Sequence, residues 1–165
     1  MAALPNPTTM RAWHTFLQAH ALITERLEVE LQLERDLGLN WYDVLVQLSQ
    51  ARDGRLRMTE LAAAVLLSKS GLTRLIDRMN GEGLVERQPD PGDKRGTYVQ
   101  LTTTGLRRLQ AAAPIHLRGI QEHFGAAITE AEAESLATAL SKVVNALAHS
   151  RTVAVERPFE NPPFE

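Results

Sequence analysis

The chain is 165 residues long, about the length of one domain, and its hydrophobic (44%) and charged (23%) contents are ordinary for a soluble globular protein. Its net charge of −2 argues against a uniformly basic nucleic-acid-binding surface, and the absence of cysteine excludes disulfides, thiolate metal sites and thiol-based redox sensing. No apolar run follows a basic N-terminus or reaches membrane-spanning length, so we expect no membrane partner and a cytoplasmic location.

The charges are unevenly distributed along the chain. Residues 55–108 contain 10 basic and 6 acidic residues, a balance of +4, whereas the remainder contains 8 basic and 14 acidic residues, a balance of −6. A basic centre between acidic ends favours a localised phosphate-binding face attached to a part with another role.

The N-terminal third of the sequence has the pattern of two helices. Apolar residues at helical spacing predict a long helix over about residues 8–36, capped by a threonine at its start and ended by Gly38. A second helix is predicted over residues 40–51, before a turn at residues 53–54. Its inward-facing residues are predicted to be Val44, Leu45 and Leu48.

The middle of the chain has the pattern of a helix-turn-helix. Thr59 is predicted to cap a short helix and Ser68 to cap the next one. In the second helix, four apolar residues fall at i, i+3, i+4 and i+7 and are predicted to face the core: Leu72, Leu75, Ile76 and Met79. The opposite face then carries side chains of the types that bind base edges and phosphates: Lys69, Ser70, Thr73, Arg74, Asp77 and Arg78.

A β-hairpin is predicted to follow this helix pair. Residues 84–87 read as a strand, residues 90–93 (Asp-Pro-Gly-Asp) as a turn and residues 97–101 as the returning strand, with Lys94 and Arg95 at the tip. A winged helix-turn-helix has this order of elements, and it places one helix in the DNA major groove and the hairpin over the flanking backbone. The sequence therefore predicts a protein that binds double-stranded DNA.

Two further helices are predicted after the hairpin. The first begins at Thr102 or Thr103, and a capping box at residues 129–132 (Thr-Glu-Ala-Glu) begins the second. Together with the first helix of the chain, they have more apolar surface than one small winged helix can cover. Because helices from both chain ends commonly bundle with a symmetry mate, we expect a homodimer.

These elements define the predicted fold class, which is mainly α with a small β-wing: a winged helix-turn-helix plus a dimerisation bundle of the terminal helices. Four parts are expected along the chain: an N-terminal dimerisation helix (1–36), a winged helix-turn-helix DNA-binding domain (37–103), C-terminal dimerisation helices (104–150) and a C-terminal arm (151–165).

Several motifs occur in the order and spacing of one known family. They are Leu-Gly-Leu-Asn-Trp-Tyr-Asp-Val-Leu at 37–45, Ser-Gly-Leu-Thr-Arg-Leu-Ile-Asp-Arg-Met at 70–79, Gly-Leu-Val-Glu-Arg at 83–87 and, most specific, Asp-Lys-Arg-Gly at 93–96 before Leu-Thr at 101–102. Over nearly the whole chain these residues resemble the MarR family of bacterial transcriptional regulators. The resemblance implies an obligate dimer with two winged helices on a pseudo-palindromic operator, and usually repression that a small ligand relieves.

The resemblance also implies roles for individual residues. Those that would read the major groove are Ser70, Thr73 and Arg74, and those on phosphates are Lys69 and Arg78. Arg95 matches the wing arginine that enters the minor groove, where a narrow A·T-rich groove favours a guanidinium. Lys94 lies beside it at the tip, and Asp93 would orient the hairpin by pairing with an arginine.

A ligand site is implied by the same resemblance. Family members bind anionic aromatic compounds in a cleft between the dimer helices and the winged domain. Six residues are candidates for lining such a cleft here: Trp13, His14, Trp41, Tyr42, Asp43 and His116. The alternative is structural, because aromatic residues at helical spacing are more often core, and Asp43 would then cap or pair locally.

No cofactor, metal site or catalytic site is expected. His14 and His20 lack chelating spacing, and His116 and His123 lie seven residues apart without a close acidic cluster to complete a site. An enzyme is the least expected class, since the sequence contains no Gly-rich phosphate loop, nucleophile elbow or metal-binding helix motif.

Two alternatives to a ligand-responsive repressor stay open on the sequence alone. One is a regulator, activator or repressor, that binds no small ligand, because the sign of regulation depends on where the operator lies relative to the promoter. The other is a winged helix used as a protein-interaction module, against which the basic hairpin tip and the polar face of the second helix both count.

Overall fold

The computed structural model describes residues 4–65, 69–90 and 92–150, and for residues 69, 70, 94, 95 and 148–150 it describes the backbone alone. The elements in chain order are α1 (Pro7–Arg35), α2 (Leu39–Gln50), β1 (Arg55–Arg57), α3 (Met58–Ala64), α4 (Lys69–Gly81), β2 (Val85–Asp90), β3 (Asp93–Leu101), α5 (Thr103–His123), a short 3-10 helix η1 (Gly125–Ala127) and α6 (Glu130–Ser150). The predicted fold class is confirmed. The predicted Ser68 cap and the arm at 151–165 lie outside the described residues.

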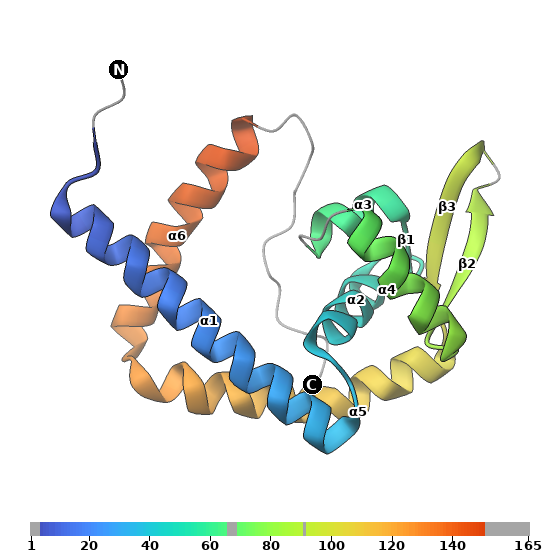
Figure 1. Cartoon of the computed structure of the whole chain (residues 1–165), viewed down its shortest axis with the longest axis horizontal. Helices are drawn as coiled ribbons and strands as arrows, with labels where there is room; N and C mark the ends of the chain where they lie inside the picture. Colours follow the sequence, from blue (N-terminus) through green and yellow to red (C-terminus); the bar gives the residue numbers. More distant parts are fainter. Residues whose placement is uncertain (1–3, 66–68, 91, 151–165) are drawn as a thin grey trace.

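The elements form a winged part attached to three long helices (Figure 1). The winged part contains α2, α3, α4 and a three-stranded antiparallel sheet of order β1-β3-β2. From the end of β3, α5 leads away from the winged part and packs along α1. Among the helices that the structure describes, none combines the length and apolar character needed to cross a membrane.

Local hydrogen bonds decide where α1 begins and ends. The Thr9 amide donates a hydrogen bond of 2.8 Å to the Asn6 side chain, so Asn6, and not a threonine, is the N-cap. The helix ends at Asp36, whose φ of 50° lies in the left-handed region that short polar side chains tolerate. The prediction that Gly38 ends this helix is therefore wrong; Gly38 is the N-cap of α2.

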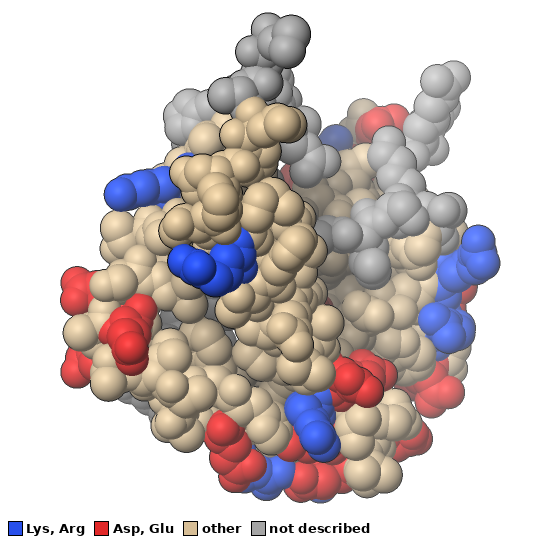
Figure 2. All heavy atoms as spheres, turned by 60° about the vertical axis from the view of Figure 1, so that its left-hand side comes forward, with Lys and Arg blue, Asp and Glu red and all other residues tan. Residues whose placement is uncertain are grey.

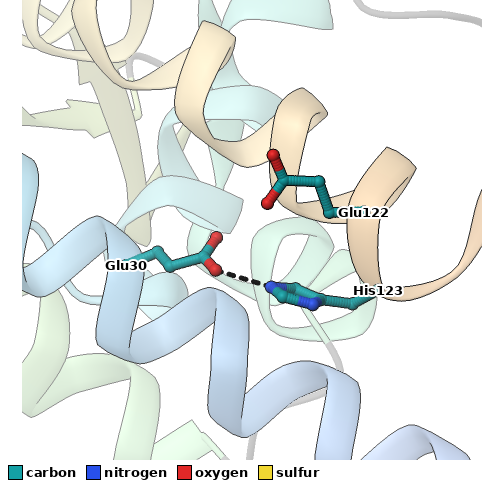
Figure 3. Close-up of side chains that lie close together, drawn as sticks. All are labelled: Glu30, Glu122 and His123. Carbon is teal, nitrogen blue, oxygen red and sulfur yellow. Dashed lines mark hydrogen bonds and ion pairs between the residues drawn. The ribbon is translucent and has the colours of Figure 1, made fainter.

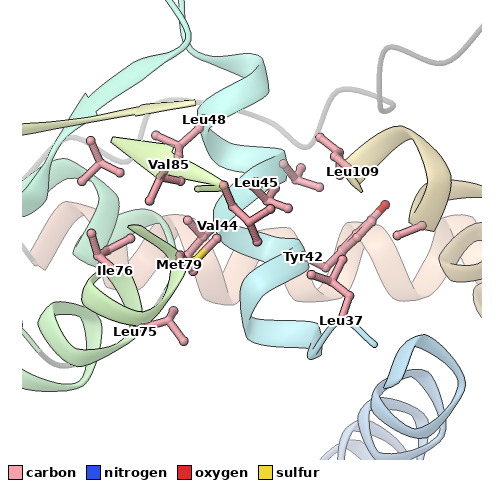
Figure 4. Close-up of a cluster of buried hydrophobic side chains, with 14 of the residues drawn as sticks. Leu37, Tyr42, Val44, Leu45, Leu48, Leu75, Ile76, Met79, Val85 and Leu109 are labelled. Atoms are coloured by element: carbon pink, nitrogen blue, oxygen red, sulfur yellow. The ribbon is translucent and has the colours of Figure 1, made fainter. Parts of the chain in front are cut away.

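The core of the winged part lies where α2, α4 and the sheet meet (Figure 4). The predicted apolar stripe of α4 is confirmed, since all four of its members are buried: Leu72, Leu75, Ile76 and Met79. The predicted inward residues of α2 are buried as well: Val44, Leu45 and Leu48. Burial of each such side chain stabilises the fold by about 1.5–3 kcal/mol. This packing fixes which side of α4 faces outward.

The start of the helix-turn-helix differs from the prediction in two ways. The Arg57 amide donates a hydrogen bond of 2.8 Å to the Glu60 carboxylate, and Arg57 rather than Thr59 is the N-cap of α3. The sequence does not predict β1, because a three-residue strand is too short to show an alternating pattern. It exists through antiparallel pairing with β3, in which Leu56 lies opposite Val99.

Thr102 joins the end of α4 to the start of α5. Its hydroxyl lies 2.7 Å from the Gly83 carbonyl and 3.0 Å from the Leu84 carbonyl, and the same oxygen accepts a hydrogen bond of 3.0 Å from the Gly105 amide. The Thr102 amide donates to the Leu84 carbonyl, and the Leu84 amide donates to the Met79 carbonyl at the end of α4. One short segment thus holds both helices.

Gly105→Ala is expected to lower the free energy of unfolding by about 1–3 kcal/mol, the usual cost of overpacking. Gly105 is buried, and an added Cβ would overlap the Leu84 carbonyl and lie 2.9 Å from Leu101 Cδ1. Urea unfolding measures the effect. Gly81→Ala is the control, because a Cβ there meets nothing within 4 Å. Equal free energies of unfolding for the two variants would show that the fold has room for a Cβ between Gly105 and the Leu84 carbonyl.

The predicted capping box at the start of α6 is confirmed. The Glu132 amide donates to Thr129 Oγ1 at 3.3 Å, and the Glu132 carboxylate accepts from both the amide and the hydroxyl of Thr129 at 2.8 Å. These bonds favour the charged carboxylate and so lower the pKa of Glu132.

Candidate nucleic-acid interface

One side of α4 is polar and faces solvent. Thr73, Arg74, Asp77 and Arg78 are exposed, whereas the apolar stripe on the opposite side is buried. No group in the described part of the chain bonds to the guanidinium groups of Arg74 and Arg78. Guanidinium groups that are free on an exposed helix face are available for base edges and phosphates.

An ion pair holds α4 against the hairpin. Arg87 Nη2 on β2 lies 2.9 Å from Asp77 Oδ1, and it also donates a hydrogen bond of 3.3 Å to the Thr73 carbonyl. Asp77 therefore serves the contact between α4 and β2. This arrangement partly neutralises a carboxylate that would otherwise repel DNA phosphates.

The β2–β3 hairpin is the wing. It pairs in antiparallel register from Val85 and Leu101 at its base to Asp90 and Asp93 near its tip, with an irregularity between Pro89 and Asp90. In Figure 1 the hairpin extends away from the body of the winged part. The hairpin therefore extends beyond the surface that α4 presents.

The predicted DNA-contact residues fall on these two elements. Thr73, Arg74 and Arg78 lie on the exposed side of α4. Only the backbone is described for four others, which belong to α4 and β3: Lys69, Ser70, Lys94 and Arg95.

A carboxylate–arginine pair that sequence reasoning missed joins the wing to β1. It joins Arg57 Nη2 to Asp90 Oδ2 at 2.5 Å. The sequence assigns Asp90 only to a turn, because Arg57 lies far away along the chain. That Asp93 pairs with an arginine stays a prediction.

The six candidate ligand residues lie in three places. Trp13 and His14 are exposed near the start of α1, where the Trp13 ring packs against Phe16 with centroids 6.1 Å apart. Trp41 is half-buried and packs against the core of the winged part. The structure packs Tyr42 against His116, and Asp43 follows Tyr42 on α2, where its charge acts on the Tyr42 hydroxyl.

Tyr42 on α2 and His116 on α5 pack ring against ring, with centroids 4.3 Å apart. Burial raises the pKa of Tyr42 to about 12, with the Asp43 charge adding to the effect, and burial lowers the pKa of His116. His116 Nδ1 is buried and has no hydrogen-bond partner among the described residues. Asp43 is exposed by area, yet the surrounding protein atoms displace enough water to raise its pKa to about 6. Shifted pKa values of this kind are typical of functional sites.

The raised pKa of Asp43 predicts a pH-dependent stability. The carboxyl has a pKa of about 6 in the folded chain against 3.8 ordinarily, so the folded state binds the proton more tightly and stability falls as the pH rises from about 4 to about 6. Allowing for solvent screening, Asp43→Asn is expected to raise the free energy of unfolding at neutral pH by about 1 kcal/mol. Urea unfolding of both chains across this pH range tests the prediction. A difference between them that is independent of pH would contradict it.

A pocket of about 470 Å³ lies where α1, α2, α4 and α5 meet. Its walls include Trp41 from α2, Arg78 from α4 and Arg108 from α5. Arg108 Nη2 donates to the Asp36 carbonyl at 2.8 Å, while Arg108 Nε is buried without a hydrogen-bond partner in the described part of the chain. The lining also includes three acidic residues, Glu28, Asp36 and Glu82, so the pocket offers guanidinium donors beside an indole within a wall of mixed charge. It touches both α4 and the long helices.

A second polar cluster ties α1 to the end of α5 (Figure 3). His123 Nε2 lies 2.5 Å from Glu30 Oε1, and one ligand atom from each of Glu30, Glu122 and His123 lies within 4.8 Å of the others. The expectation that no acidic cluster lies close to these histidines is therefore wrong for His123. Sequence reasoning missed it because Glu30 is 93 residues away along the chain. Arg118 strengthens the same contact by pairing with Glu34.

The arrangement of α3, α4 and the hairpin is that of a winged helix-turn-helix protein. Residues 35–96 match the model of the MarR family. AbsC, a MarR family transcriptional regulator from Streptomyces coelicolor, has a similar structure with a TM-score of 0.80 and 34% identity, covering 90% of this chain and 99% of AbsC. Sco3205, a MarR family transcriptional regulator from the same organism solved in complex with DNA, gives a TM-score of 0.82 and 28% identity over 89% of this chain and 92% of Sco3205. The transcriptional repressor YetL of Bacillus subtilis (strain 168) is 36% identical over 86 residues, 52% of this chain and 52% of YetL.

The chain belongs to the MarR family of transcriptional regulators, which are not enzymes. The resemblance noted from its motifs is thereby confirmed.

Proposed function

We propose that this protein is a sequence-specific transcriptional repressor that binds a pseudo-palindromic operator as a homodimer in the cytoplasm and is released by a small aromatic anion. DNA binding is inferred mainly from the outward side of α4. There Arg74 and Arg78 lie one helical turn apart, and neither guanidinium has a partner in the described chain. Similarity to Sco3205, which was solved in complex with DNA, and to the repressor YetL supports this role.

In this proposal the contact residues divide between base reading and backbone binding. The residues that read base edges in the major groove are Ser70, Thr73 and Arg74, and those that hold phosphates are Lys69 and Arg78. The wing inserts Arg95 into the minor groove, with Lys94 beside it and Asp93 orienting the tip.

An apolar face on the three long helices supports the homodimer. These helices leave many large apolar side chains exposed: Trp13, Phe16, Leu17 and Leu22 on α1, Leu117 and Ile120 on α5, and Leu136, Val143, Val144 and Leu147 on α6. A groove of about 610 Å³, lined by Phe16, Phe124 and Leu136 among others, continues this face. In Figure 2 the central area of this side is mostly uncharged: it contains a few Lys or Arg side chains and otherwise neither basic nor acidic residues. A second copy would cover such a patch in a symmetric interface.

The dimer sets the distance between the two α4 helices. Successive major grooves on one side of DNA are about 34–36 Å apart, so both helices bind only at that separation. The pocket beside Trp41 lies between α4 and the long helices, and an anion in it would change the position of α4. To lower operator affinity tenfold, the ligand must bind the released arrangement about 1.4 kcal/mol more favourably than the DNA-binding arrangement.

Fluorescence anisotropy with the DNA upstream of its own gene tests the DNA-binding function. We expect tight binding to that segment over a scrambled sequence, with an affinity that falls steeply as salt rises, because phosphate contacts release counterions. Equal weak binding to both sequences would contradict a specific operator there.

The same assay with a panel of aromatic acids tests release. An acid that fits the pocket is expected to raise the melting temperature and lower operator affinity, and Arg108→Gln is expected to remove both effects. Arg107→Gln is the matched control, since Arg107 is an exposed neighbour on α5 outside the pocket. A response that survives Arg108→Gln would place the ligand elsewhere, and the Tyr42–His116 pair is the next site to test.

A further inference from the structure

We propose that Asp90 is a positioning residue for the wing: together with Arg57 and Tyr98 it fixes the direction of the hairpin tip, and so the place that Arg95 takes in the minor groove. The inference rests on the proposed DNA-binding function. Asp90 is the one buried charged residue in the described part of the chain, with a side chain that is 5% exposed. A buried carboxylate destabilises a fold unless it is paired and hydrogen-bonded. Asp90 forms an ion pair through Oδ2 and accepts a hydrogen bond through Oδ1, while Oδ2 has no hydrogen-bond partner in the described part of the chain.

The Asp90 carboxylate holds the tip from both sides. Its Oδ1 accepts a hydrogen bond of 2.9 Å from the Gly92 amide, on the outgoing side of the tip. On the returning side, Gly96 packs so closely that an added Cβ would lie 2.8 Å from Asp90 Cβ and 3.0 Å from Oδ2. Arg95 directly precedes Gly96, so its backbone is attached to a segment that packs on Asp90.

Arg57 anchors this carboxylate to the far edge of the sheet. Because the strand order is β1-β3-β2, the Arg57 side chain spans β3 to reach Asp90 on β2, where Nη2 lies 2.5 Å from Oδ2. On the way its Nε donates a hydrogen bond of 3.3 Å to the Tyr98 hydroxyl on β3. The Arg55 guanidinium lies over the same ring, 4.8 Å from its centroid. All three strands are therefore joined through side chains on one surface of the sheet.

The backbone alone does not fix the tip. The β2–β3 register shifts between Pro89 and Asp90, which interrupts the regular ladder just before the tip. A two-stranded ribbon that extends beyond the core is marginally stable by itself. The Asp90 contacts begin at the point where the ladder becomes irregular. By restricting the tip before binding, the Asp90 contacts reduce the conformational entropy that Arg95 would lose on binding DNA. This preorganisation raises the affinity for DNA.

Backbone ¹⁵N relaxation tests the structural half of this proposal without DNA. Asp90→Asn keeps the size of the side chain and removes its charge. The variant is expected to show lower heteronuclear NOE values at Gly92 and Gly96, reporting faster local motion, while Gly105 at the start of α5 stays unchanged. Unchanged values at both tip glycines would overturn the proposal.

A double-mutant cycle in the anisotropy assay tests the functional half. Asp90→Asn is expected to lower operator affinity about tenfold in the natural chain but less than about twofold when Arg95 is already alanine, because the two residues act through one contact. In an Arg74→Ala background the loss is expected to stay about tenfold. A merely structural role would give the same loss in all three backgrounds, and that result would overturn the proposal.

Arg57→Gln provides a second variant in case Asp90→Asn does not fold. Arg57 is 43% exposed in its side chain, so its replacement disturbs packing less, and the same dependence on Arg95 is expected. A loss that persists in the Arg95→Ala background would mean that Arg57 contacts DNA itself and would overturn its positioning role. If the unsubstituted chain does not prefer its upstream DNA over scrambled DNA, the proposed function is contradicted. That measurement is made before any variant is compared, so the two failures are distinguishable.

Discussion

Arg74→Ala is expected to lower affinity for the operator roughly 5- to 150-fold, because one bidentate base contact is worth about 1–3 kcal/mol. The structure leaves the Arg74 guanidinium exposed and without a partner in the described chain, so its removal leaves no buried group unpaired. Binding to scrambled DNA should change much less than binding to the operator. Anisotropy on both sequences gives the two losses.

Two companion variants separate base reading from charge. Arg74→Lys keeps the positive charge but loses the planar fork of donors, so it should retain binding to scrambled DNA and lose preference for the operator. Arg78→Ala should instead weaken binding to all sequences and reduce the salt slope by about 1. If Arg74→Ala lowered both affinities equally, Arg74 would be a phosphate contact and the assignment of base reading would be wrong.

Val144→Glu is expected to convert the proposed dimer to a monomer and to reduce operator affinity at least a hundredfold. Val144 is 59% exposed on α6, between Val143 and Leu147, which are also exposed. In a dimer interface a glutamate here would be an unpaired charge in an apolar setting. A monomer binds one half-site and loses the effective concentration, of millimolar order, that links the two winged parts.

Thr138→Glu is the matched control, because Thr138 is an exposed residue of the same helix that lies about 120° around α6 from Val144 and about 180° from Leu147. Light scattering after size-exclusion chromatography gives the mass of each variant, and anisotropy gives its affinity. A Val144→Glu protein that stays dimeric with normal affinity would remove α6 from the interface. A natural chain that is monomeric at micromolar concentration would contradict the dimer itself.

The parts of the fold that the sequence predicts are those with a local signal. The stripe from Leu72 to Met79 repeats at the helical period, so it identifies both the helix and its outward side. The capping box at Thr129 and Glu132 is likewise read from neighbouring residues. These patterns locate the solvent-facing side of α4 that we propose contacts DNA, because whatever lies opposite a buried stripe must face solvent.

Features made by distant residues could not be predicted in this way. β1 forms only through its antiparallel pairing with β3, in which Leu56 lies opposite Val99, and the Arg57–Asp90 pair depends on the same strand pairing. The six ligand candidates were chosen by residue type, and apart from the Tyr42–His116 contact they are spread over the fold, since residue type does not determine which helix packs against which. The cluster around Glu30 and His123 was missed for the same reason.

The Thr102 junction makes α5 a lever. With 21 residues, α5 is about 32 Å long at 1.5 Å per residue. The hydroxyl of its N-cap, Thr102, is bonded to the Gly83 and Leu84 carbonyls that follow α4, so the two helices are coupled directly. If α5 turns as one straight rod across Pro114 in its interior, a rotation of about 5° at one end moves the other end by about 3 Å, close to the 3.4 Å rise of one base pair. In the proposed dimer, small changes where α1, α5 and α6 meet would thus be magnified into a misfit on the scale of the DNA's own spacing.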